Sequence, residues 1–175
     1  MTPRKNKGKL NGEQKWKAAG DDMKILVSAC LLGENCKYNG GNNYNAAVAE
    51  YAKGKDALPI CPERMAGMGC PRTPIEIVEG VLMDRNGNNV DAAMRKAVAK
   101  AMEMIQKEDI QCAILQSRSP TCGVNEIYDG SFSGRLIPGS GVLAQALKDN
   151  GYRVIDAEDV SDVLRRVEQR QAESV

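Results

Sequence analysis

The sequence predicts an α/β fold: a single Rossmann-like, three-layer domain with a mostly parallel sheet. Two observations favour this class. Short aliphatic runs alternate along the chain with segments of helical period, the order expected of strands joined by helical crossovers. The length of 175 residues suits one domain with a sizeable core. Right-handed crossovers would place helices on both faces of the sheet.

Residues 1–22 are predicted to lie outside this domain as a flexible, basic N-terminal tail. Leu10 and Trp16 are its only bulky apolar residues, too few to offset the entropy of ordering the segment. Its five lysines and one arginine against three acids would attract RNA weakly, although a solvated extension is the simpler interpretation. Residues 23–175 then form the domain.

Four sheet strands and four helices are expected in this domain. The strands are short aliphatic runs at residues 24–29, 56–60, 112–116 and 152–155. The helices are at residues 46–53, 89–107, 142–148 and 157–169; the second has an apolar residue every three or four positions. Asn45 is a suitable cap for the first helix. Residues 75–83 suit an extended segment or a hairpin arm.

Long connections separate several of these elements. Residues 33–45 are rich in glycine and asparagine, which allows backbone amides to approach a ligand. Residues 63–76 (ERMAGMGCPRTPIE) have neither helical nor alternating period, and we expect a structured loop. Loops of this length in a compact domain are usually functional or mobile.

The amino-acid composition excludes several classes of catalytic site. The chain has no histidine, which excludes Ser-His and Cys-His nucleophile pairs and HExxH zinc hydrolases. A formal charge of +1 requires no nucleic-acid or membrane partner. No apolar run approaches eighteen residues and no signal peptide is evident, so we expect a cytoplasmic protein whose six cysteines are reduced.

Three cysteines occupy equivalent places after predicted strands. Cys30 follows residues 24–29, Cys61 follows residues 56–60, and Cys122 lies a few residues after the third strand. If these strands are parallel, all three thiols lie beyond carboxyl ends, where open α/β sheets bind ligands. Zinc sites usually have paired CxxC spacing, which is absent. A metal or iron–sulfur site and three unrelated buried cysteines remain alternatives at this point.

Nearby polar residues add candidates. Glu63 follows Cys61 by two positions and could exchange protons there, although a surface glutamate is equally compatible. Ser119, three residues before Cys122, could bind a ligand or stabilise a turn. Cys36 and Cys70 lie in the same loops and are possible substitutes, whereas Cys112 within a strand is expected to be a small buried hydrophobe.

The segments SACLLG, CKYNGG, ICPE, CPRTPIEI and SPTCG, in this order and spacing, resemble the thiouracil desulfidase family over about residues 23–163. The resemblance implies a [4Fe-4S] cluster with three cysteine ligands and one open iron, which takes sulfur from a thiolated pyrimidine. Carried over by motif, the ligands are Cys30, Cys61 and Cys122, with Glu63 and Ser119 as catalytic groups.

The resemblance also bears on the substrate. The implied reaction is non-redox desulfuration to uracil or uridine plus sulfide. Lys37, Asn39 and Gln116 stand where the family usually has arginine, aspartate and lysine, which concerns substrate preference more than cluster binding. Thiouracil, 4-thiouridine as a nucleoside, and thiolated tRNA all stay open as substrates, as does the oligomeric state. The alternative function is a non-catalytic iron–sulfur or zinc binding module, possibly RNA-associated, in which Cys36 or Cys70 closes the metal site.

Overall fold

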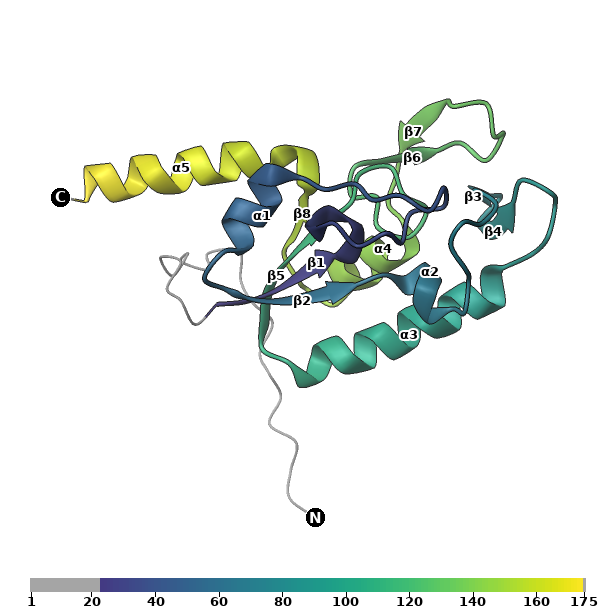
Figure 1. The fold of residues 1–175 in the computed structure, drawn as a ribbon, viewed down its shortest axis with the longest axis horizontal. Coiled ribbons are helices and arrows are strands. Elements are labelled where there is room, and N and C mark those ends of the chain that lie inside the picture. Colours follow the sequence, from purple (N-terminus) through teal and green to yellow (C-terminus); the bar gives the residue numbers. More distant parts are fainter. Residues whose placement is uncertain (1–22, 175) are drawn as a thin grey trace, which may run out of the picture.

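The structure is a computed structural model that describes residues 23–174. The predicted basic tail at residues 1–22 lies outside the described residues, as does Val175. At the centre is a parallel sheet of four strands in the order β2-β1-β5-β8 (Figure 1). The strands are β1 (Lys24–Ser28), β2 (Asp56–Ile60), β5 (Ile110–Leu115) and β8 (Val154–Asp156). The predicted α/β class with a parallel sheet is confirmed.

Helices cover both faces of this sheet. Ile25 and Val27 pack with α1 (Ala46–Ala52) and α5 (Val160–Glu173), whereas Leu26 packs with α3 (Asp91–Lys107) and α4 (Val142–Asp149). Successive side chains of a strand point to opposite faces, so β1 contributes to two cores at once. This explains why its sequence is continuously apolar rather than alternating.

Two antiparallel hairpins lie at the end of the sheet to which β1 and β2 point (Figure 1). One joins β3 (Ile75–Val78) to β4 (Val81–Asp84), within the segment expected to be extended. The other joins β6 (Glu126–Tyr128) to β7 (Leu136–Pro138). It was not predicted, because strands of three residues are too short to display a period. The buried Glu76 carboxylate connects the hairpins by accepting from Gly130 N (3.0 Å) and Phe132 N (3.2 Å).

Other differences from the expected elements are local. The prediction that residues 63–76 contain no helix is wrong at their start, where α2 (Pro62–Met65) forms one turn. Pro62 stands at the beginning of that turn, where its fixed φ suits a helix and its missing N–H has no consequence. The closing helix is preceded by a 3₁₀ turn, η2 (Ala157–Asp159), in which the Glu158 N–H donates to the Asp156 carboxylate at 2.8 Å.

Among residues 23–174, no helix is both long and apolar enough to cross a membrane.

Candidate active site

The sheet topology brings the three predicted cysteines together. Cys30 lies in the 3₁₀ turn η1 (Ala29–Leu32) immediately after β1, and Cys61 is the N-cap of α2 immediately after β2. Cys122 lies on the loop that follows β5. Since β2, β1 and β5 are neighbouring parallel strands, their carboxyl ends meet at one edge.

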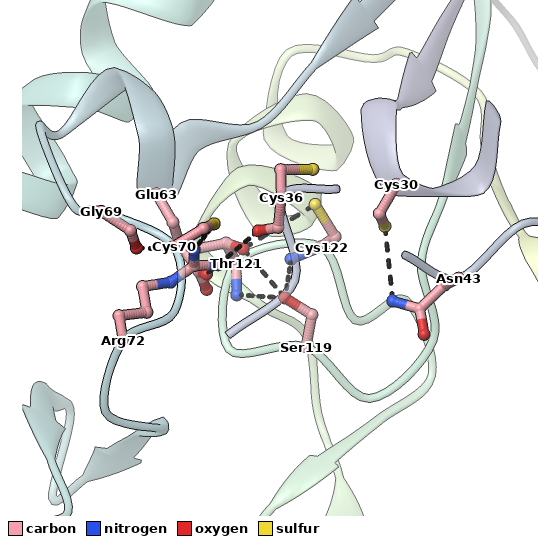
Figure 2. Close-up of polar contacts among 10 residues, drawn as sticks. All are labelled: Cys30, Cys36, Asn43, Glu63, Gly69, Cys70, Arg72, Ser119, Thr121 and Cys122. Carbon is pink, nitrogen blue, oxygen red and sulfur yellow. Dashed lines mark hydrogen bonds and ion pairs between the residues drawn. The ribbon is translucent and has the colours of Figure 1, made fainter. Parts of the chain in front are cut away.

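All five predicted site residues line one cavity of about 430 Å³: Cys30, Cys61, Glu63, Ser119 and Cys122. Figure 2 shows the sulfur atoms of Cys30, Cys36 and Cys122 directed from three different loops toward a common space. The structure thus places these five side chains on the wall of a single cavity.

The thiols are close enough to affect one another's ionisation. Burial raises the pKa of the Cys122 thiol to about 12; hydrogen bonds from Ser28 and Thr121 oppose this rise, while Cys30 and Cys61 add to it. Burial also raises the pKa of Cys30, and Cys61 contributes in the same direction. A metal ion bound by these thiols would favour their deprotonated form, because a cation stabilises the coordinating thiolates.

Hydrogen-bond donors lie close to the sulfur atoms of Cys30 and Cys122. Asn43 Nδ2 lies 3.5 Å from Cys30 Sγ, and Thr121 Oγ1 lies 3.8 Å from Cys122 Sγ. Burial raises the pKa of the Cys36 thiol, and the neighbouring Cys61 contributes in the same direction through its charge and a hydrogen bond. Donors placed at sulfur atoms are typical of sites that hold thiolates.

Ser119 organises the Cys122 loop. Its Oγ accepts from Thr121 N and Cys122 N, both at 3.1 Å, and lies 2.9 Å from Thr121 Oγ1. A hydroxyl has two acceptor positions and one proton. With both acceptor positions occupied by backbone N–H groups, Ser119 donates its proton to Thr121, which leaves the Thr121 proton for Cys122 Sγ. The turn-stabilising role weighed from the sequence is thus present, and Ser119 also lines the cavity.

The remaining cysteines have other surroundings. Cys36 is buried at 2 % exposure and lines the cavity. Cys70 is exposed, and its sulfur lies 2.9 Å from Arg72 Nη1. Cys112 is buried within β5, with its sulfur 4.0 Å from the Tyr51 hydroxyl. Cys112 is the small buried hydrophobe that the sequence indicated.

Arg72 is a site residue that sequence reasoning missed. Its guanidinium forms a close ion pair with the Glu63 carboxylate, and both side chains line the cavity (Figure 2). Arg72 lies in the CPRTPIEI segment, but the local sequence contains no signal that pairs it with a carboxylate nine positions earlier. Lys37 and Gln116, singled out for substrate preference, also line the cavity, whereas Asn39 Oδ1 accepts from Gly41 N in its own loop.

Within residues 23–174, no three cysteine, aspartate or glutamate side chains are grouped as ligands of a single metal ion. For one tetrahedral ion with metal–sulfur bonds near 2.3 Å, the sulfurs would have to lie about 3.8 Å apart.

Comparisons with known proteins give consistent matches. A family model described as 2-thiouracil desulfurase matches residues 25–159. The chain is 36% identical over 150 residues to the uncharacterized protein YbbK of Bacillus subtilis (strain 168), covering 80% of this chain and 99% of that protein. Among solved structures, the [4Fe-4S]-dependent thiouracil desulfidase TudS is similar with a TM-score of 0.75 and 31% identity, covering 84% of this chain and 99% of that one.

Proposed function

Because the chain belongs to the 2-thiouracil desulfurase family and is therefore a carbon–sulfur bond-cleaving enzyme, we propose that it desulfurates a thiolated pyrimidine with a [4Fe-4S] cluster. The ligands would be Cys30, Cys61 and Cys122, leaving one iron without a protein ligand. Glu63 and Ser119 would be the catalytic groups. The products are the oxo-pyrimidine and sulfide.

One observation carries this proposal: three thiols from three neighbouring strand ends line a single cavity together with a carboxylate. Thiolates are the usual protein ligands of iron–sulfur clusters. The hydrogen-bond donors at Cys30 and Cys122 fit the same role, because they stabilise negative charge on sulfur. The [4Fe-4S] dependence of TudS, which is similar in fold and sequence, further supports this cofactor.

When bound, the cluster would supply a Lewis-acidic iron that polarises a thiocarbonyl group. Glu63 would accept a proton from the water as its oxygen bonds to the thiocarbonyl carbon of the ring, and would return that proton as the carbon–sulfur bond breaks and sulfide leaves. The carboxylate is suited to this role because its side chain is 12 % exposed. Limited solvent access keeps the transferred proton at the site.

Ser119 would orient the ring or the water. Its oxygen already accepts hydrogen bonds from two backbone N–H groups. Ser119 would therefore act toward a ligand as a hydrogen-bond donor. Rotation of that O–H from Thr121 Oγ1 toward the cavity would provide a hydrogen bond to a pyrimidine oxygen or to water.

The cavity favours a small substrate. Its volume of about 430 Å³ lies within the range of roughly 300 to 1,000 Å³ usual for small-molecule sites. We propose thiouracil or 4-thiouridine as the substrate, with thiolated tRNA as a further candidate. The polar side chains of Lys37 and Gln116 on the wall are placed to distinguish among them.

Anaerobic purification of the full chain, with iron and sulfide analysis and turnover assays, tests the proposal. We expect about four irons per chain and release of sulfide from 4-thiouracil or 4-thiouridine. Parallel assays with thiolated tRNA rank the three substrates. A protein that contains the cluster but releases no sulfide from any of them would overturn the enzymatic proposal, and an active protein without iron would overturn the cofactor.

A further inference from the structure

Arg72 is a buried cation whose contacts connect the loops around the cavity. Its side chain is 10 % exposed. Nη2 donates to the Glu63 carboxylate and to the Cys36 carbonyl oxygen (2.9 Å), and Nη1 donates to the Gly69 carbonyl oxygen (3.3 Å). The Arg72 backbone N–H donates to the Tyr38 carbonyl oxygen at 2.7 Å. One residue therefore holds the α2 turn against the loop that contains Cys36 (Figure 2).

The ion pair engages one oxygen of the carboxylate. Arg72 Nη2 contacts Glu63 Oε2, and Arg72 is the one residue within positions 23–174 that hydrogen bonds this carboxylate. A bidentate Arg–carboxylate pair would occupy both oxygens. Here the second oxygen, Oε1, keeps its acceptor capacity, and Glu63 lines the cavity.

Arg72 itself is not fully satisfied. Its Nε is buried without a hydrogen-bond partner. Leaving a buried donor unpaired is costly. The orientation observed is the one in which the η nitrogens reach Glu63 and the Cys36 carbonyl together.

We propose that Arg72 is a positioning residue that acts through Glu63: it fixes Oε2 so that Oε1 is presented to the reacting water in the cavity. This inference rests on the proton-transfer role of Glu63 in the proposed function. A lysine could not replace it fully, because a single ammonium cannot extend a planar fork to Glu63, the Cys36 carbonyl and the Gly69 carbonyl at once.

A double-mutant cycle tests this role, using the full chain purified anaerobically as wild type, Glu63→Gln, Arg72→Met and the double variant. Residues that act as one unit have non-additive effects. We expect Arg72→Met to lower kcat by about 10- to 100-fold with little change in KM, and the double variant to be no slower than Glu63→Gln alone within about threefold. Iron content should stay near that of wild type.

Effects on kcat that multiply in the double variant would show that Arg72 acts independently of Glu63, and would overturn the inference. If Glu63→Gln keeps more than about a third of wild-type turnover, against the 10²- to 10⁴-fold usual for an acid-base group, the proposed role of Glu63 has failed instead. The two failures are therefore distinguishable.

A stability measurement, a second variant and a control variant distinguish this positioning role from a merely structural one. Anaerobic thermal unfolding of the four proteins should show that Arg72→Met alone is less stable than the double variant, because it leaves a buried carboxylate unpaired. If Arg72→Met does not retain iron, the cycle is run with Arg72→Lys, which keeps the charge but not the fork. The matched control is Arg64→Met on the same short helix, an exposed arginine paired with Glu34, for which kcat and iron content should be unchanged.

Discussion

Gly141 and Thr121 are in such close contact that a Cβ on Gly141 would lie 2.4 Å from the Thr121 carbonyl carbon and 2.8 Å from the Cys122 nitrogen. The Thr121 carbonyl accepts from Leu143 N at 2.9 Å, in the first turn of α4. The loop that contains Cys122 therefore packs directly against the start of α4, a helix whose side chains are part of the hydrophobic core.

Replacing Gly141 by alanine should displace this loop, because neither backbone segment can yield without breaking its hydrogen bonds. We expect destabilisation of roughly 1 to 3 kcal/mol, as for other overpacked sites, together with reduced iron content. Anaerobic thermal unfolding and iron analysis check this outcome. Wild-type stability and iron content in Gly141→Ala would show that the contact does not hold Cys122 in place.

Substitution of Cys122 should remove both cofactor and activity. With two remaining thiolates, a cluster is poorly held, so Cys122→Ala is expected to lose most of its iron. The matched control is Cys112→Ala, which removes a buried thiol from β5 that does not line the cavity and should keep iron near the wild-type level. Equal iron loss in both variants would point to a general packing defect rather than to ligation.

Cys36 should prove dispensable for assembly. Its thiol lines the cavity beside Cys61, and burial raises its pKa, so Cys36→Ala is expected to remove a neighbour of a ligand and not a ligand. We expect near-normal iron content and an altered cluster reduction potential, since hydrogen bonds to sulfur influence that potential. Spectroscopic redox titration measures the shift. Loss of the cluster would instead make Cys36 a fourth ligand and would close the iron proposed to be open.

Asp91 should contribute to stability in a pH-dependent manner. The Leu82 N–H (3.1 Å) lowers the pKa of the Asp91 carboxyl below its usual 3.8; burial opposes this effect, and Arg95 adds to it. Because the folded pKa is the lower one, this stabilisation is present above the unfolded pKa and is lost as pH falls through the folded value. Wild type should therefore lose stability below about pH 4.

Asp91→Asn should flatten that part of the stability curve, since the amide does not titrate. Urea denaturation at pH 7, 4 and 3 measures it, with Asp109→Asn in the turn between α3 and β5 as the control. A variant as acid-sensitive as wild type would show that other carboxylates account for the loss of stability.

The sequence by itself determined much of this protein. Aliphatic runs and helical periods predicted all four strands of the central sheet and the four α-helices packed on its two faces, with boundaries that differ from the structure by a few residues. Position alone identified Cys30 and Cys61, because each follows a strand directly, and the placement of ligand crevices at strand ends is a general property of parallel sheets. The short motifs then indicated the family.

Tertiary structure decided what depends on contacts between distant segments. The pairing of Arg72 with Glu63, the Asn43 donor at the Cys30 sulfur and the close contact of Gly141 with Thr121 join residues from separate segments of the chain. Local propensity contains no information about such partners. The hairpin of β6 and β7 was not predicted either, because its three-residue strands are too short to display a period. Its contacts with the Glu76 carboxylate, through Gly130 N and Phe132 N, also join distant segments. Short-range patterns determine which elements form, whereas the three-dimensional arrangement of their ends determines which side chains meet.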